Sequence, residues 1–273
     1  MAGGKYLRAL CRCREWLGAQ PGFVMAIHFG GRSARLVSST VRYTEIIVDA
    51  SMTSAHDARN FYLQGPAGRL EAILWTPTEP GPQEAALAAV VCHPHPLFGG
   101  TMHNKVVYQA AKSLDVLGLP VLRFNFRGAG LSAGVHDRGI GEQDDVRAAL
   151  DFLAEQFPGV PLLVAGFSFG AWVGLRVGCE DKRVSHLVGL GIPLNSSDFS
   201  FLGRCHQAKL FVHGSDDAYG ALKKVQSLVR SLAGENHLVV VPGADHFFAG
   251  QLGQLDAAVT NWLGEVVRLR HSS

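Results

Sequence analysis

Short apolar runs alternate with longer helical stretches along most of this chain, and this alternation constrains the fold more than any other feature. The apolar runs are rich in Val, Leu and Ala, as in strands that are buried on both faces of a parallel sheet. They lie at residues 87–92, 120–126, 161–165, 184–190, 209–213 and 237–241. Strands that alternate with helices in this way form a mostly parallel sheet with helices on both faces, so we predict an α/β fold.

The stretches between these runs carry helix signals. Apolar periodicity and end signals predict helices over residues 104–117, 141–156, 169–178, 219–233 and 252–269. Ahead of the first run, residues 60–64 and 69–76 predict a hairpin that turns at Gly-Pro-Ala-Gly. No internal repeat or linker divides the chain after residue 51, so we expect one domain over residues 52–273.

Composition and charge exclude several classes of protein. The 273-residue chain is 47% hydrophobic with a formal net charge of +2, which argues against a mostly disordered chain and against a nucleic-acid binder. No run approaches the roughly 20 apolar residues of a membrane-spanning helix, so we expect no membrane partner. The five cysteines are odd in number and irregularly spaced, so we expect no disulfide framework and a cytoplasmic, reducing location.

Residues 1–51 differ from the rest of the chain. The stretch from Met1 to Thr44 contains seven basic residues and a single acid, Glu15, a balance that resembles a transit peptide. Alternatively, translation starts naturally at Met52, and we adopt the hypothesis that residues 1–51 are an upstream extension outside the core fold. The Cys11-x-Cys13 pair has no second cysteine pair to complete a zinc site.

The strongest functional signal is the serine of Gly-Phe-Ser-Phe-Gly, residues 166–170, between a predicted strand and a predicted helix. A serine on such a sharp turn presents its hydroxyl above the sheet, and the flanking glycines leave room for the turn. The helix that follows offers free backbone N–H groups and the positive end of its dipole. We therefore take Ser168 as a candidate nucleophile rather than as a residue of an ordinary turn.

A serine hydroxyl needs a base and an acid that orients the base. His246 is the candidate base, because it lies among small and acidic residues in a loop after the last predicted strand. Asp216 and Asp217 compete as the orienting acid, since both follow the preceding strand at its carboxyl end, where sites form in such sheets. Asp245 is a weaker third candidate, because a residue adjacent to the histidine points elsewhere in most loop geometries.

Acyl transfer also needs N–H donors for the oxyanion of the tetrahedral intermediate. The backbone N–H of Phe169, directly after the serine, is one candidate. The second is expected from residues 93–102, His-Pro-His-Pro-Leu-Phe-Gly-Gly-Thr-Met, which follow the first buried run. Proline has no N–H, so only His95 and the residues from Leu97 onward can donate from this loop.

The histidines of this loop also raise the possibility of a metal site, but the sequence argues against one. His93, His95 and His103 could supply imidazole ligands, but the prolines turn the chain between them and no carboxylate follows at ligand spacing. We therefore predict hydrogen-bonded loop histidines, with neither metal nor cofactor.

A second dense motif follows the strand at 120–126, as Arg-Phe-Asn-Phe-Arg-Gly-Ala-Gly-Leu-Ser. This loop could shape the substrate pocket. We favour a structural role instead, in which Arg127 forms a salt bridge to Glu142 or Asp145 and supports the floor of the site.

Together these residues resemble the α/β-hydrolase superfamily. More narrowly, the chain is similar to small bacterial α/β-superfamily hydrolases marked by His-Pro-His-Pro-x-x-Gly-Gly-x-Met, Arg-Phe-Asn-Phe-Arg-Gly, Gly-x-Gly-Glu-x-x-Asp and Gly-Phe-Ser-Phe-Gly. These motifs stand here at residues 93–102, 123–128, 139–144 and 166–170, and the resemblance covers about residues 61–269. It implies an α/β-hydrolase fold and a serine carboxylesterase that works through an acyl-serine intermediate.

The resemblance also ranks the open alternatives. The family spacing His-Gly-x-x-Asp selects Asp217 over Asp216 as the acid beside His246. Aligning His93-Pro94 with the His-Gly of relatives makes the N–H of His95 the first choice for the oxyanion hole and that of Leu97 the second.

Many relatives insert a helical cap after the sixth core strand, but residues 191–207 are too few for one. We therefore expect an open site for small, soluble, short-acyl esters, without lipase action. Residues that could line an apolar acyl pocket are Ile192, Pro193, Leu194, Phe98, Phe167, Phe247 and Phe248. The alternatives are amide, peptide or thioester hydrolysis by the same residues and a non-catalytic binding protein, and the sequence leaves a homo-oligomer open.

Overall fold

The computed structural model describes residues 28–29, 32–33, 56–78 and 85–271. The chain divides into two units, Met1–Ala50 and Ser51–Ser273. In the first unit, strand β1 (His28–Phe29) pairs antiparallel with β2 (Arg32–Ser33). The remaining predictions for residues 1–51, including the one for Cys11 and Cys13, lie outside the described residues.

The second unit is built on an eight-stranded sheet with the order β10-β9-β8-β7-β5-β6-β4-β3. Strand β4 runs antiparallel to both of its neighbours, and every other adjacent pair is parallel. The strands are β3 (His56–Gly65), β4 (Gly68–Pro77), β5 (Ala88–Cys92), β6 (Val121–Phe124), β7 (Leu162–Phe167), β8 (Val184–Leu190), β9 (Ala208–Gly214) and β10 (Asn236–Val241).

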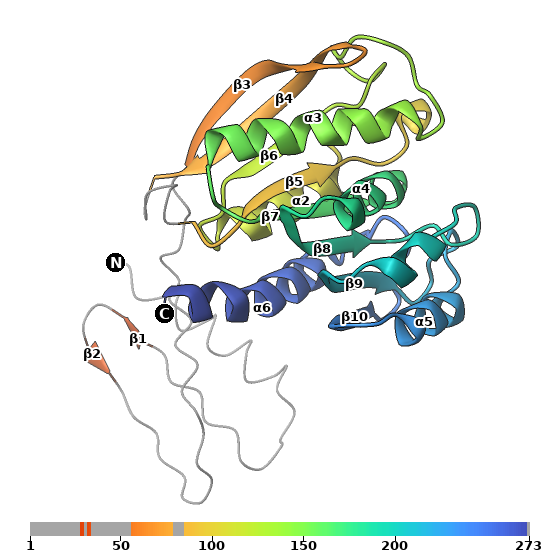
Figure 1. Cartoon of the computed structure of the whole chain (residues 1–273). Helices are drawn as coiled ribbons and strands as arrows, with labels where there is room; N and C mark the ends of the chain where they lie inside the picture. The colour runs from red at the N-terminus through yellow and green to blue at the C-terminus, as the bar shows by residue number, and fades with distance from the viewer. Residues whose placement is uncertain (1–27, 30–31, 34–55, 79–84, 272–273) are drawn as a thin grey trace, which may run out of the picture. The chain divides into compact units, whose positions relative to one another are not determined.

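Five described helices cover the two faces of this sheet (Figure 1). They are α2 (Lys105–Asp115), α3 (Gly141–Gln156), α4 (Phe169–Glu180), α5 (Leu222–Ser231) and α6 (Leu252–His271). Apolar residues of α3, α4 and α5 join one hydrophobic core, and those of α2 and α6 join a second core on the opposite face. The predicted α/β fold, a mostly parallel sheet with helices on both faces, is confirmed.

Strand β5 shows why the sheet strands read as continuous apolar runs. Val90 and Cys92 belong to the core under α3 and α4, whereas Ala89 and Val91 belong to the core under α2 and α6. Successive side chains of a strand point to opposite faces, so a strand covered on both faces needs apolar residues at every position. All five residues of β5 are buried.

Helix α5 starts three residues later than predicted. The spacing predicts a helix from residue 219, but α5 begins at Leu222. The backbone N–H groups of Tyr219 and Gly220 instead donate to Oδ1 of Asp217, at 2.8 and 3.2 Å. This turn fixes the carboxylate of Asp217. The carbonyl oxygens of Tyr219 and Gly220, which a helix starting at 219 would use, instead accept the N–H of Asn195 and the Nε2–H of His213. The first helical turn is therefore displaced to Leu222.

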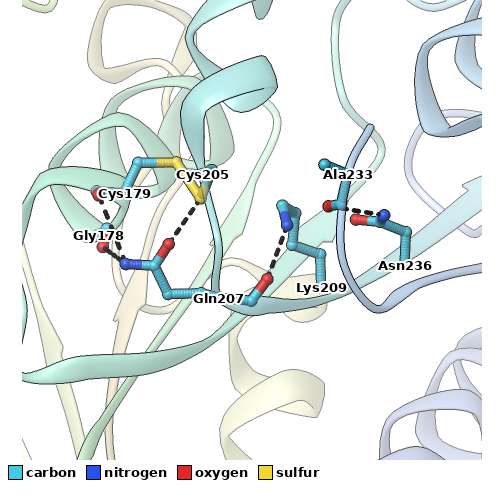
Figure 2. Close-up of a disulfide and its surroundings, with 7 residues drawn as sticks. All are labelled: Gly178, Cys179, Cys205, Gln207, Lys209, Ala233 and Asn236. Atoms are coloured by element: carbon cyan, nitrogen blue, oxygen red, sulfur yellow. Dashed lines mark hydrogen bonds between the residues drawn. A yellow bond between two sulfur atoms is a disulfide. The ribbon is translucent and has the colours of Figure 1, made fainter. Parts of the chain in front are cut away.

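A disulfide joins Cys179, near the end of α4, to Cys205, and the expectation of no disulfide is wrong for this pair (Figure 2). The two cysteines are 26 residues apart and meet because helix α4 ends beside the segment that leads into β9. Nε2 of Gln207 donates to the carbonyl oxygens of Gly178 and Cys179, at 3.0 and 3.4 Å. Irregular cysteine spacing in the sequence carried no sign of this contact.

Lys209 lies next to this region and is fully buried (Figure 2). Its Nζ donates to the backbone carbonyl of Gln207 at 2.7 Å. Burial lowers the pKa of the lysine, because the charged form loses its hydration.

The connection from β8 to β9 carries only a short 3₁₀ helix, η3 (Ser200–Arg204). This connection therefore places no cap domain over the carboxyl end of the sheet, as the sequence predicts. Among the described helices, none is long and apolar enough to cross a membrane.

Candidate active site

Ser168 lies in the sharp turn between β7 and α4, with φ of 55° and ψ of −119°. A positive φ is uncommon outside glycine and indicates a backbone held by its surroundings. A Cβ at position 166 would collide with the backbone of Gly170. A Cβ at position 170 would collide with the carbonyl oxygens of Cys92 and His93. The two glycines therefore allow the turn, and they let the start of α4 touch the end of β5.

A continuous chain of hydrogen bonds joins Ser168, His246 and Asp217. Nδ1 of His246 lies 2.8 Å from Oδ2 of Asp217, and Nε2 lies 2.9 Å from Oγ of Ser168. A carboxylate only accepts, so Nδ1 carries the hydrogen and Nε2 is free to accept from the serine hydroxyl. His246 and Asp217 are both buried, at 4% and 5% exposure. The arrangement can move a proton from the serine to the imidazole.

The structure separates the three candidate acids. Asp217 contacts the imidazole through one oxygen and accepts the N–H groups of its own turn through the other. Asp216 is exposed and accepts a hydrogen bond from the hydroxyl of Ser215. Asp245 is also exposed, and its Oδ1 accepts from the N–H groups of Phe247 and Ala249. Only Asp217 is in a position to orient His246.

Aromatic rings hold the imidazole of His246 in place. Its ring centroid lies 4.4 Å from that of Tyr219 and 5.1 Å from that of Phe167. His213, at the end of β9, lies beside the acid, with its Nε2 3.7 Å from Oδ2 of Asp217. The same Nε2 donates to the carbonyl of Gly220 at 2.6 Å. Burial lowers the pKa of His213, which favours its neutral form.

The loop after β5 uses the N–H groups of Leu97, Phe98 and Gly100 in hydrogen bonds within its own turn. Leu97 donates its N–H to Nδ1 of His95, and the N–H groups of Phe98 and Gly100 bond to the carbonyl of His95. The N–H of His95 itself enters no hydrogen bond within the described part of the chain. Phe169 begins α4, where the first N–H groups lack intrahelical acceptors. Of the predicted donors, His95 and Phe169 are therefore free to bind an oxyanion, and Leu97 is not.

His93 is a structural residue whose two ring nitrogens are both used. Nδ1 lies 2.6 Å from the carbonyl of Pro94, to which it donates, and Nε2 accepts the N–H of Phe126 at 2.9 Å. Burial is the main cause that lowers the pKa of His93 to about 4, so the ring is neutral at physiological pH. Across the described residues there is no group of three or more His, Cys, Asp or Glu that could hold a metal ion.

The favoured structural role of Arg127 is confirmed. Its guanidinium bonds to both oxygens of Asp145, with the shortest contact at 2.7 Å, and Asp145 is completely buried. Glu142 has a different partner: its Oε1 lies 2.7 Å from Nδ1 of His136, and its oxygens accept the N–H groups of Asp137 and Gly139. These two acids fix the loop between β6 and α3.

Two residues that contact the site carried no sequence signal for it. The ring of His136 lies 4.7 Å from that of His95, and the ring of Tyr219 lies against His246. Both sit in loops far from the serine in sequence, and neither belongs to a motif that places it there. Three proposed pocket residues are completely buried in the two hydrophobic cores, so these assignments are wrong: Ile192, Phe167 and Phe248.

Known proteins resemble this chain over most of its length. A family model described as serine aminopeptidase, S33, matches residues 85–194. An uncharacterized protein of Rickettsia prowazekii is 37% identical over 211 residues, which are 74% of this chain and 87% of that protein. The match thus extends well beyond the residues that form the site.

Two solved structures are similar in sequence and in fold. An α/β serine hydrolase without a lid from Xanthomonas campestris is 37% identical, with a TM-score of 0.71, over 77% of this chain and 94% of that one. An α/β serine hydrolase homologue from Coxiella burnetii is 38% identical, with a TM-score of 0.70, over 75% of this chain and 97% of that one.

Proposed function

The chain belongs to the α/β-hydrolase superfamily, with lidless bacterial serine hydrolases among its relatives, and we propose that it is a serine carboxylesterase acting on small, soluble, short-acyl esters. The observation that carries the proposal is the chain of hydrogen bonds from Ser168 through His246 to Asp217. The positive φ of the serine and the free donors beside it add support.

In the proposed mechanism, Oγ of Ser168 attacks the ester carbonyl while Nε2 of His246 takes its proton. Asp217 holds the imidazole in the required tautomer and stabilises the imidazolium. The backbone N–H groups of His95 and Phe169 stabilise the oxyanion of the tetrahedral intermediate. His246 then protonates the leaving alcohol, and later it removes a proton from the water that attacks the acyl-serine and releases the acid.

The open site supports soluble esters as substrates. The β8–β9 connection holds no cap, so nothing in that segment encloses a long acyl chain or provides an interface-activated lid. Phe98 and Phe247 are 86% and 53% exposed, so they line an open surface rather than a deep tunnel. Short acyl groups need no deeper enclosure.

Amide hydrolysis is the second candidate, because the matched family model is described as serine aminopeptidase. An aminopeptidase needs acidic groups that grip the substrate amine. The exposed acids nearest in sequence to the site residues, Asp216 and Asp245, are each engaged in a local turn. Esters are therefore favoured, and comparing an aryl ester with an aminoacyl anilide separates the two activities.

The test is hydrolysis of p-nitrophenyl acetate and butyrate at pH 8 by the wild type and by Ser168→Ala. We expect the wild type to turn over both esters and the variant to fall to the uncatalysed rate. A fluorophosphonate probe should label the wild type and not the variant. A wild type that neither hydrolyses the esters nor takes the label overturns the proposal in favour of a binding protein.

A further inference from the structure

We propose that the apolar rim, defined here as Leu97, Phe98, Leu131, Val135, Ile140, Tyr219 and Phe247, binds the apolar groups of the substrate, and that the preferred esters carry apolar groups on both the acyl and the alcohol side. This inference rests on the proposed function and names the substrate class of the same site. It commits the rim to the substrate rather than to a membrane or a second protein.

Exposed apolar side chains are concentrated at one edge of the sheet. Nine large hydrophobic residues are exposed in the described part of the chain, and the seven rim residues all lie in loops that follow β5, β6, β9 or β10. The other two are Tyr62 on β3 and Tyr108 on α2. Single exposed apolar residues are normal on protein surfaces, but seven of them in segments at the edge of the sheet that carries the candidate site indicate a ligand surface.

Phe98, one part of the rim, is connected to the residue after the serine by ring contacts through His95. The ring of Phe98 is 86% exposed and lies 4.8 Å from the ring of His95. His95 in turn lies 4.8 Å from the ring of Phe169, the residue after Ser168. A substrate carbonyl held by the backbone of His95 and Phe169 therefore places one of its substituents near Phe98.

Phe247 and Tyr219, another part of the rim, lie against the candidate base His246. Phe247 lies 5.3 Å from the ring of His246 and 6.4 Å from that of Tyr219, and both aromatic residues are at least half exposed. Nε2 of His246 must meet the leaving alcohol as well as Oγ of Ser168. A substrate in the site therefore has a second apolar surface within reach, and an ester has two substituents to occupy the two surfaces.

The charges in these loops favour a neutral ligand. The exposed charged residues of the four loops are Arg138, Asp216 and Asp245, one base and two acids. Such a surface lacks the cluster of basic residues that draws a protein to anionic lipids. Neutral, uncharged esters fit it best.

The test measures selectivity ratios, so that each protein is its own reference. On the acyl side, kcat/KM is compared for p-nitrophenyl hexanoate and acetate. On the alcohol side, it is compared for benzyl acetate and ethyl acetate, whose alcohols have similar acidity. Burying a methylene fully is worth about fourfold, so a half-covered chain on an open rim should gain about twofold per methylene.

The variants are Phe98→Ser and Phe247→Ser, with Tyr62→Ser as the matched control, because Tyr62 is 46% exposed outside the rim. We expect each rim variant to lower at least one of the two ratios by threefold or more, and the control to leave both ratios at the wild-type values. Rim variants with wild-type ratios overturn the inference. So does loss of phosphatidylcholine-vesicle binding or of self-association in a rim variant whose ratios are unchanged.

Fluorophosphonate labelling keeps the two proposals apart. A wild type that takes no label contradicts the esterase proposal. A wild type that is labelled, with a hexanoate-to-acetate ratio and a benzyl-to-ethyl ratio near one, contradicts the rim proposal alone.

Discussion

Two adjacent aspartates of the site differ in their contacts. Asp217 and Asp216 carry the same group, yet one is buried against His246 and the other is exposed. We expect Asp217→Asn to lower kcat by roughly 10³-fold or more, because an amide no longer fixes the imidazole tautomer. Asp216→Asn should stay within a few-fold of the wild type. Equal losses in the two variants, measured with p-nitrophenyl acetate, would contradict the assignment of the acid.

His93 should make stability depend on pH. Burial is the main cause that lowers its pKa to about 4 in the folded protein, against 6.5 for the free side chain. Between these values the unfolded chain binds more protons, so stability falls as the pH drops from 6.5 to 4, by about 3 kcal/mol in total from this residue.

The measurement is the free energy of unfolding in urea at pH 7.5 and pH 5. The wild type should lose about 2 kcal/mol more than His93→Gln between these values, since about 1.5 pH units of the window are crossed. An NMR titration of the wild-type ring gives an independent check: protonation of His93 near pH 6.5 in the folded state would refute the argument.

Among single residues, the sequence predicts those that a local pattern marks. Ser168 and His246 each follow a predicted strand in a recognisable turn, and the prolines around His95 reduce the number of candidate N–H donors in that loop. The spacing of Asp216 and Asp217 could not decide between them on physical grounds, because adjacent residues both follow the strand. The ring contacts of Tyr219 and His136 depend on loops meeting in space, which no local pattern records.

Between elements, the start of α4 comes very close to the end of β5 beside the site. A Cβ at Gly170 would overlap two carbonyl oxygens, whereas Gly253 in α6 has open space around it. We expect Gly170→Ala to destabilise the protein by several kcal/mol and to abolish esterase activity, because backbone must shift at the oxyanion hole. Gly253→Ala should raise the stability by up to about 1 kcal/mol. Thermal unfolding of both variants tests this, and similar shifts in the two would contradict the contact.

The strands and helices were largely predictable, because most are long and periodic. Helix α3 and strand β8 have the predicted bounds, and the strands buried on both faces were found as apolar runs. Helix α5 was predicted too long at its start, because Asn195 and His213 bind the carbonyl oxygens of Tyr219 and Gly220 that a longer helix would use. The failure thus falls where the site overrides local propensity.

On the scale of the whole molecule, the disulfide joins two segments that the sheet order brings together. It closes a loop of 26 residues, which corresponds to about 3.5 kcal/mol of stabilisation from the restricted unfolded chain. Reduction with dithiothreitol should lower the unfolding temperature of the wild type to that of Cys205→Ser. The variant should not respond to the reductant, although it keeps the buried, free Cys92. An equal response in both proteins would show that another cysteine is responsible.

The separation between a rigid turn and an exposed rim has an evolutionary consequence. Glycine contacts and turn hydrogen bonds hold the acid, the base and the nucleophile, so we expect substitutions there to destabilise the protein. The exposed side chains around them bear little of the packing, so mutation can replace them at small thermodynamic risk. Selection can therefore change the substrates of such a protein while its backbone stays superimposable on that of its ancestors. Descendants with the same fold then differ in substrate specificity.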